Sequence, residues 1–182
     1  MMLLLAACQQ SNYIDDLSDT SFVLIDADGN QVAFPDDFEG KIVLAGFIYT
    51  YCPDICPMTT ANMRVVREQM QNPSDVQFVT LTFDPERDTP EVMARYREAY
   101  GLTDTDWKFL TGEPDVIERL MQRMRVRVET SSSETTADGE AVYFLNHTDQ
   151  ISLIDQQGRV VFNYGGSMTP PDIFVEDIQK LR

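Results

Sequence analysis

The sequence has few cysteines, one histidine and few basic side chains. Three cysteines in 182 residues are too few for a disulfide framework, but they are enough for one functional pair and one further thiol. The 14 Lys and Arg residues are outnumbered by 30 Asp and Glu residues, which gives a formal net charge of −16. Such an acidic chain is poorly suited to neutralising phosphates, so no nucleic-acid partner is expected.

Long hydrophobic runs are also missing beyond the N-terminus. The longest, residues 42–51, has the length of a strand, whereas a membrane-spanning helix requires about 20 apolar residues. The hydrophobic content of 43% and the charged content of 24% are ordinary for a globular protein. A chain of this length can bury roughly 70% of its unfolded surface in one domain. We therefore expect one folded domain at residues 20–182.

The third cysteine, Cys8, ends the apolar stretch at the N-terminus. Residues 5–8 read LAAC, which resembles the bacterial lipobox, in which the cysteine becomes the first mature residue and carries lipid. This resemblance implies a lipid anchor on Cys8, a signal remnant and tether at residues 1–19, and a domain on the periplasmic or extracytoplasmic side of a bacterial membrane. The alternative is an ordinary apolar N-terminus with a buried thiol.

The order of hydrophobic patterns predicts an α/β domain. The apolar run at 42–49 is typical of a strand buried on both faces, and Thr89 with Pro90 has the form of a helix start. Strands and helices alternate, which favours a mixed sheet with helices on both faces. The other expected elements are a hairpin at 22–25 and 32–34, a helix from about 57, strands at 76–83 and 107–110, a helical face at 116–124, a polar surface loop at 131–139, strands at 143–145, 150–154 and 159–164, and a helix from about 169.

Cys52 and Cys56 lie in the segment TYCPDICP at residues 50–57, between a predicted strand and a predicted helix. This position places both thiols near a helix N-terminus, whose positive dipole end favours thiolate. Four-residue spacing can bring both sulfurs to one side of a helical turn, where they suit Cu(I) or zinc or can form a disulfide. Two buried core cysteines are the alternative, since cysteine is often buried.

Three segments together resemble the Sco/SenC family, the copper chaperones of cytochrome c oxidase assembly. They are FIYTYCPDICP at 47–57, TFDPERDTP at 82–90, and His147-Thr148 followed by ISLID at 151–155 and GRVV at 158–161. The resemblance covers the chain from about residue 20 to its end. It implies a thioredoxin-like fold with a central mixed sheet flanked by helices and an N-terminal hairpin. Asn146 departs from the family pattern, because many relatives carry an acidic residue there.

The resemblance also implies a copper site. Cys52 and Cys56 would supply thiolates and His147, the only histidine of the chain, would supply an imidazole, holding one Cu(I) or Cu(II) ion per chain. Zinc is the main competing metal for such a set. The implied partners are the copper-binding subunit of cytochrome c oxidase and other periplasmic copper chaperones or thioredoxin-like reductants. Asp84, Arg87 and Asp88 are expected to fix a strand-to-helix turn and are left out of the metal set.

Two other functions use the same residues. A thiol-disulfide oxidoreductase would use Cys52 and Cys56 as a redox-active pair, although the spacing is one residue longer than the C-x-x-C of thioredoxins. A copper or redox sensor would signal its state to another protein. We expect a metallochaperone, with no catalytic residues beyond this pair. Met58, a thioether beside the motif, is a further residue to examine.

Overall fold

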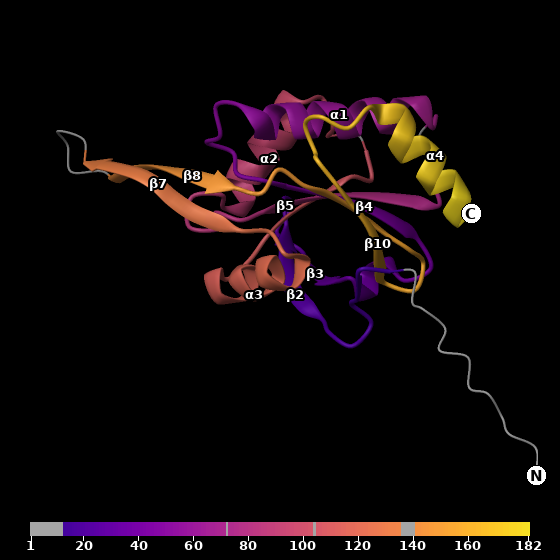
Figure 1. Cartoon of the computed structure of the whole chain (residues 1–182). Helices are drawn as coiled ribbons and strands as arrows, with labels where there is room; N and C mark the ends of the chain where they lie inside the picture. Colours follow the sequence, from indigo (N-terminus) through magenta and orange to yellow (C-terminus); the bar gives the residue numbers. More distant parts are fainter. Residues whose placement is uncertain (1–12, 72, 104, 136–140) are drawn as a thin grey trace, which may run out of the picture.

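The structure, a computed structural model, describes residues 13–71, 73–103, 105–135 and 141–182 (Figure 1). An eight-stranded sheet has the order β1-β10-β9-β4-β5-β6-β2-β3, and β7 pairs with β8 in a separate two-stranded ribbon. The strands are β1 Asp15–Asp16, β2 Phe22–Asp26, β3 Gln31–Phe34, β4 Ile42–Ile48, β5 Val76–Thr82, β6 Lys108–Thr111, β7 Val128–Thr135, β8 Ala141–His147, β9 Ile151–Ile154 and β10 Arg159–Tyr164. The helices are α1 Ile55–Gln69, α2 Pro90–Ala99, α3 Pro114–Met124 and α4 Pro171–Leu181.

The sheet is mixed, as the sequence predicts. Its centre is parallel, because β4 pairs with β5 and β5 with β6 in the same direction, while β9 joins β4 antiparallel. Every residue of β4 and β5 is buried. β4 is continuously apolar, and β5 buries Gln77, Thr80 and Thr82 among its apolar residues, so both strands require cover on both faces.

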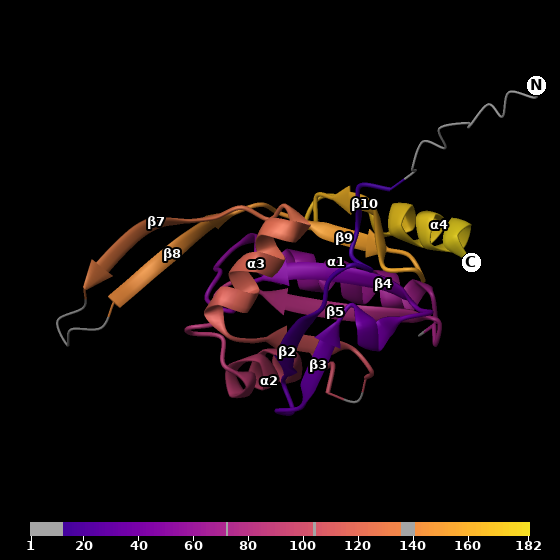
Figure 2. The same cartoon turned by 90° about the horizontal axis from the view of Figure 1, so that it is seen from below.

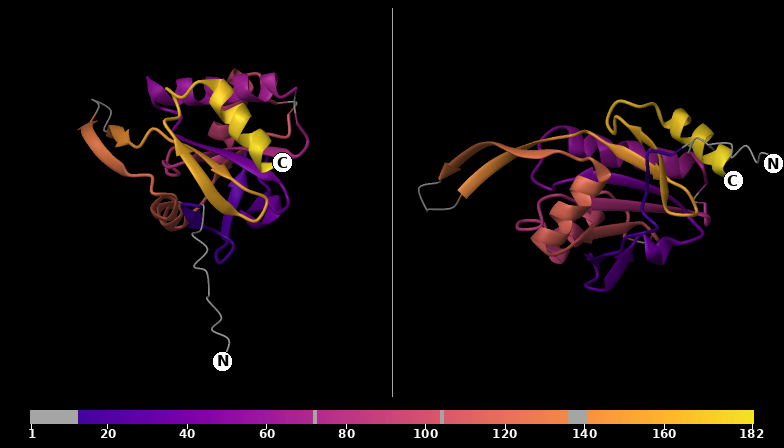
Figure 3. Two further views of the ribbon diagram at one scale, coloured as in Figure 1. Left: turned by 45° about the vertical axis from the view of Figure 1, so that its right-hand side comes forward. Right: turned by 60° about the horizontal axis from the view of Figure 1, so that its bottom comes forward.

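Helices cover both faces of the sheet, which confirms the expected layers. In Figures 1 and 2, α1 and α4 lie on one face and α3 lies on the other. One buried cluster joins the sheet to α3 through Ile117, Leu120 and Met124, and a second includes Met63 of α1 and Phe174 of α4. Figure 3 shows the same arrangement from two further directions.

Two sequence details set how helices meet the sheet. Thr89 caps α2 as predicted, because its side chain accepts a hydrogen bond from the Val92 N–H at 3.4 Å. Gly46 lets α1 approach β4 closely, since a Cβ at this position would collide with Sδ of Met63. The helix α1, whose first turn contains Cys56, therefore packs directly against the central strand β4.

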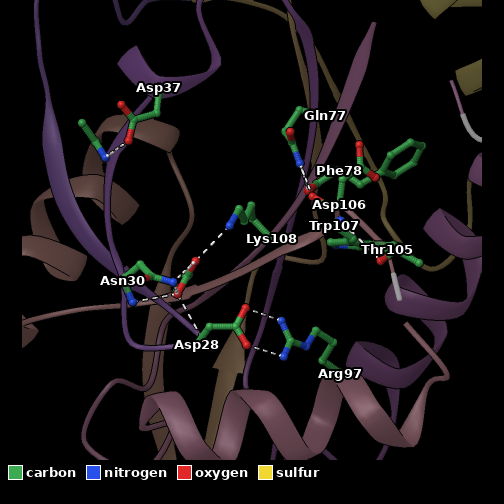
Figure 4. Close-up of polar contacts among 12 residues, drawn as sticks. Asp28, Asn30, Asp37, Gln77, Phe78, Arg97, Thr105, Asp106, Trp107 and Lys108 are labelled. Atoms are coloured by element: carbon green, nitrogen blue, oxygen red, sulfur yellow. Dashed lines mark hydrogen bonds and ion pairs between the residues drawn. The ribbon is translucent and has the colours of Figure 1, made fainter. Parts of the chain in front are cut away.

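A polar network ties the N-terminal hairpin to the rest of the domain (Figure 4). Arg97 of α2 donates two hydrogen bonds to the Asp28 carboxylate, at 2.9 and 2.7 Å. Lys108 of β6 donates to Asp26, a carboxylate that is 1% exposed, at 2.9 Å. The hairpin turn is thus held against both β6 and α2, so the predicted hairpin is an edge of the main sheet.

The predicted polar loop at 131–139 is wrong for residues 131–135, which belong to β7. The ribbon runs from the pair Val128 and His147 to the pair Thr135 and Ala141. It extends away from the body of the domain (Figures 1 and 2). A ribbon that projects from the domain covers no core along most of its length, so its strands need no alternation of apolar and polar residues. A Ser/Thr-rich strand without this alternation has the composition of a loop, which explains the wrong prediction.

The folded part of the chain begins before the predicted boundary at residue 20. Asp15 and Asp16 form β1, which pairs with β10, and Leu17 is fully buried. Cys8 lies outside the described residues, so its predicted lipidation stays a prediction. Within the described ranges, no helix is both long enough and apolar enough to span a bilayer.

Candidate metal centre

The two motif cysteines lie where β4 ends and α1 begins. Cys52 belongs to the connecting loop and Cys56 to the first turn of α1, and the Cys56 N–H donates to the Cys52 Sγ at 3.5 Å. Cys56 is 0% exposed and Cys52 is 8% exposed, and both are free thiols. The pair therefore lies beneath the surface, with Cys52 on the more accessible side.

The only histidine of the chain lies next to this pair of cysteines. His147 is the last residue of β8, and its Nε2 lies 3.5 Å from the Cys56 Sγ although 91 residues separate them. One ligand atom from each of Cys52, Cys56 and His147 lies within 4.8 Å of the others. The three residues that the family resemblance implies as ligands are thus side by side, which spacing in the sequence could not establish.

The ring of His147 is oriented by its backbone and by aromatic neighbours. Its Nδ1 lies 3.0 Å from the Thr148 carbonyl oxygen, which can only accept a hydrogen bond. Nδ1 therefore carries the proton, and Nε2 presents its lone pair to the cysteines. Phe83 and Tyr49 pack against the ring, with centroids 4.6 and 5.8 Å away. This is the tautomer that a metal ligand needs.

Burial changes the chemistry of the inner thiol. It raises the pKa of Cys56 well above the ordinary thiol value. Without a metal, Cys56 therefore stays protonated at neutral pH. A soft cation that binds here must displace this proton, so metal binding at this site releases a proton and competes with it.

The separation of Cys56 Sγ and His147 Nε2 fits two ligands of one metal ion. Bonds of about 2.0 Å to nitrogen and about 2.3 Å to sulfur, the values for zinc, put ligand atoms about 3.5–4.0 Å apart around one ion. The measured 3.5 Å between Cys56 Sγ and His147 Nε2 is within this range. Two sulfurs and one imidazole suit copper and zinc, and three protein donors leave a position for a further ligand.

Asp88 holds the loop that carries Cys52 in place through hydrogen bonds. Its buried carboxylate accepts hydrogen bonds from the Thr50 N–H at 3.0 Å and hydroxyl at 2.5 Å, and from the Thr82 hydroxyl at 2.6 Å. Burial raises the pKa of Asp88, and the hydrogen bonds from the two threonines oppose this rise. The predicted role of Asp88 in fixing the turn agrees with these contacts, which also hold the residue two positions before Cys52.

Asp84 and Arg87 connect the same region to the ribbon. Arg87 lies over the Tyr143 ring, 3.6 Å from its centroid, and donates to the Tyr143 carbonyl at 2.8 Å. Asp84 accepts from Arg87 at 2.5 Å and from the Tyr143 hydroxyl at 2.7 Å. The contact of Tyr143 with Arg87 could not be predicted from the sequence, because 56 residues separate the two.

A surface hollow of about 340 Å³ gives access to the histidine. It is lined by Arg127, Glu129, Asn146, His147 and Thr148. Met58, beside the motif, is 47% exposed. The candidate site therefore consists of Cys52, Cys56 and His147, with His147 facing an open side through which a partner could approach.

Comparison with known proteins places the whole domain in one group. A family model described as SCO1/SenC matches residues 12–182. The SCO1 protein homolog of Bacillus subtilis is 27% identical over 98% of this chain and 91% of its own length. Protein sco1 of Schizosaccharomyces pombe is 32% identical over 84% of this chain, which spans 57% of that longer relative.

Solved structures share the fold. Bradyrhizobium japonicum ScoI with copper bound has a TM-score of 0.74 and 30% identity, covering 90% of this chain and 98% of its own. A SCO1/SenC family lipoprotein from Bacillus anthracis has a TM-score of 0.73 and 27% identity, covering 96% and 98%. BsSco, a member of the Sco family of cytochrome c oxidase assembly proteins in which a disulfide switch was identified, has a TM-score of 0.72 and 25% identity, covering 93% and 95%. These likenesses confirm the thioredoxin-like α/β fold.

Proposed function

The chain belongs to the SCO1/SenC family, and on this basis we propose that it is a copper-binding metallochaperone for cytochrome c oxidase assembly. Cys52 and Cys56 bind copper through their thiolates and His147 binds it through Nε2, one ion per chain. The protein delivers this copper to the binuclear copper centre of the copper-binding oxidase subunit. Similarity to a copper-bound ScoI and to a Sco protein of oxidase assembly supports the choice of metal and recipient.

The observation that carries the proposal is the meeting of Cys52, Cys56 and His147. Two thiols and the one imidazole of the chain lie within 4.8 Å of one another, and Nε2 is free to bind a metal. Two sulfurs favour Cu(I), while imidazole also accepts Cu(II), so the ion can be held in either state. The coordination position that three protein ligands leave open supports copper transfer, because a ligand of the recipient protein can bind the ion before the bonds to Cys52, Cys56 and His147 break.

Copper titration of the reduced protein tests the site. We expect one equivalent of Cu(II) to produce a thiolate-to-copper charge-transfer absorption band, and one equivalent of Cu(I) to be held against a competing chelator. Cys52→Ala and Cys56→Ala should lose the band, and His147→Ala should shift it and weaken Cu(II) binding. Met58→Leu is the matched control, since it removes an exposed sulfur beside the site at similar volume. Unchanged spectra and affinity in the Cys52 and His147 variants would refute the assignment.

A thiol-disulfide oxidoreductase is the second candidate, and the same cysteine pair supports it. The sulfurs of Cys52 and Cys56 are close and free, and the similar protein BsSco has a disulfide switch. An oxidised pair has no thiolates for copper, so the two activities exclude each other at any one moment. His147→Ala separates them: full support of oxidase assembly by this variant, with loss in Cys56→Ser, would favour thiol exchange over copper delivery.

We also propose that the domain is held at a bacterial membrane, facing the periplasmic or extracytoplasmic side, by lipid on Cys8. The LAAC tetrad at residues 5–8 and the similar Bacillus anthracis lipoprotein support this. Mass spectrometry of the mature N-terminus should find an acylated Cys8, and Cys8→Ser should release the domain from the membrane fraction. Recovery of an unmodified Cys8 from native membranes would contradict the proposal.

A further inference from the structure

Asp149 connects the strand that carries His147 to the helix that carries Cys56. We propose that it is a positioning residue of the copper site, acting on the metal through the placement of His147. The inference rests on the proposed copper function for its metal, although the placement itself is a property of the copper-free protein. Asp149 lies two residues after His147, between β8 and β9, where no motif marks it.

The carboxylate of Asp149 joins three elements. The Thr59 hydroxyl of α1, three residues after Cys56, lies 3.3 Å from Asp149 Oδ1 and 3.0 Å from the Ile55 carbonyl oxygen, so its single proton is shared between these two acceptors. The carboxylate also accepts from the Ser167 hydroxyl at 2.6 Å and from the Ser167 N–H at 3.0 and 3.1 Å. Ser167 belongs to the connection between β10 and α4. One side chain therefore fixes the segment after His147 to α1 and to a second loop.

The contact region around Asp149 is tight. A Cβ on Gly166 would lie 2.9 Å from the Asp149 Oδ1 and 3.0 Å from a methyl carbon of Thr59. Asn62 of α1 donates to the Gly166 and Thr169 carbonyls, both at 2.8 Å. The loop at 165–169 is thus bound to α1 independently, so Asp149 is attached to a fixed surface.

The other side of the His147 segment is held by the ribbon. Thr148 and Arg127 form two hydrogen bonds of 3.0 Å, one from the Thr148 N–H to the Arg127 carbonyl and one from the Arg127 N–H to the Thr148 hydroxyl. The Thr148 carbonyl also fixes the tautomer of His147. The ring itself also contacts Phe83, Tyr49 and the Cys56 Sγ. Asp149 adds a connection between the backbone after His147 and α1 that the end of the ribbon does not provide.

Asp149 itself is not a member of the ligand group. The atoms within 4.8 Å of one another come from Cys52, Cys56 and His147, and the Asp149 oxygens are occupied by Thr59 and Ser167. Its effect on copper therefore passes through the geometry of a neighbour. Groups that hydrogen-bond a metal ligand directly typically change metal affinity by about 10- to 100-fold when they are replaced, and Asp149, which acts one contact further away, is expected at the lower end of this range.

The experiment compares Asp149→Ala and Asp149→Asn in the wild-type and His147→Ala backgrounds. We expect Asp149→Ala to bind Cu(II) about tenfold more weakly than wild type and to shift its charge-transfer band. Asp149→Asn should recover most of the affinity, because its amide can still bond to Ser167. In the His147→Ala background, Asp149→Ala should have no further effect, since there is no imidazole left to position. Asp115→Ala, an exposed carboxylate on α3, is the charge-matched control.

A second readout uses the copper-free protein. The chain has one histidine, so its imidazole NMR signals are unambiguous. They should be sharp, with a protonated Nδ1, in wild type and in Asp149→Asn, and broadened by exchange in Asp149→Ala. If Asp149→Ala fails to fold, the milder pair Thr59→Val and Ser167→Ala removes the two hydroxyl donors and leaves the Ser167 N–H bonded to the carboxylate. This pair must then give the same two effects at a smaller size.

Three results would overturn the inference: Cu(II) binding by Asp149→Ala within twofold of wild type, unchanged imidazole signals, or an equal loss of affinity in the His147→Ala background. Failure of the proposed function is a different outcome. Wild type would then bind no copper, or His147→Ala would bind it as wild type does, while the copper-free NMR comparison would still decide whether Asp149 positions His147.

Discussion

Replacing Asp88 tests how the cysteine loop is held. Its carboxylate is 0% exposed and is the acceptor for three donors, two on Thr50 and one on Thr82. Asp88→Ala leaves these donors without that acceptor. The Thr82 hydroxyl is fully buried, whereas Thr50 lies in a half-buried loop where water can replace part of the loss.

The structure sets the size of the effect. A buried donor without a partner costs about 1–3 kcal/mol, so Thr82 alone should cost about 2 kcal/mol and Thr50 about the same for its two partly hydrated donors. Removing the carboxylate also removes an unfavourable desolvation, which the raised pKa of Asp88 reflects. We expect a net loss of about 3 kcal/mol in unfolding free energy, and a smaller loss of about 1–2 kcal/mol for Asp88→Asn, which keeps one acceptor oxygen.

Urea unfolding of the reduced, copper-free protein measures this loss. With a slope of about 2 kcal/mol per molar urea, Asp88→Ala should unfold at a midpoint about 1.5 M lower than wild type. Asp115→Ala is the control, because that carboxylate is 72% exposed and its pair with Arg119 should contribute less than about 1 kcal/mol. An Asp88→Ala midpoint equal to that of Asp115→Ala would refute the view that Asp88 anchors the loop.

Three further predictions concern the core, the ribbon link and pH. Gly46→Ala should destabilise the fold by about 1–3 kcal/mol in urea unfolding, because the new Cβ overlaps Met63 Sδ, and Met63→Ala should relieve part of that strain. Arg87→Ala should speed amide hydrogen exchange in β8 and cost about 2–3 kcal/mol, and Arg87→Lys should not restore the stacking on Tyr143; unchanged exchange would contradict the link. Burial raises the pKa of Cys56 in the folded state, whereas an unfolded thiol ionises near pH 8.5, so the stabilisation is present below that pH and is lost above it. Between pH 7 and 9.5 the unfolding free energy should therefore fall by about 1.4 kcal/mol relative to Cys56→Ala, and parallel pH profiles of the two proteins would contradict this.

The sequence predicted the central layers well because their signals are strong. The continuous apolar run of β4 is stable only in the middle of a covered sheet, and Thr89-Pro90 is a helix start with a clear physical cause. Of the ribbon, part of β8 was predicted as the strand at 143–145, and β7 was missed. Residues 131–135 of β7 read SSSET and offer no alternation of apolar and polar residues from which a strand could be predicted.

The residues of the site could be predicted from the sequence, but their arrangement in space could not. Family resemblance named Cys52, Cys56 and His147, but their contact depends on the register of β8 and on where β9 rejoins β4. Asp149 and Tyr143 could not be found, because each acts on residues far away in the chain through one or two side-chain hydrogen bonds. Such contacts leave no periodicity or local motif in a single sequence.

The strand order has a consequence for when the site can form during synthesis. The central strand β4 is completed on one side by β9, with Val43 opposite Ile154, so the sheet cannot close until most of the chain has left the ribosome. The cysteines emerge about ninety residues before His147, as a bare dithiol without its third donor. The three-donor site therefore arises only in a fully folded chain, and a nascent or misfolded copy should hold Cu(II) poorly. Under the proposed copper function, binding of the metal by all three donors would therefore require the complete fold.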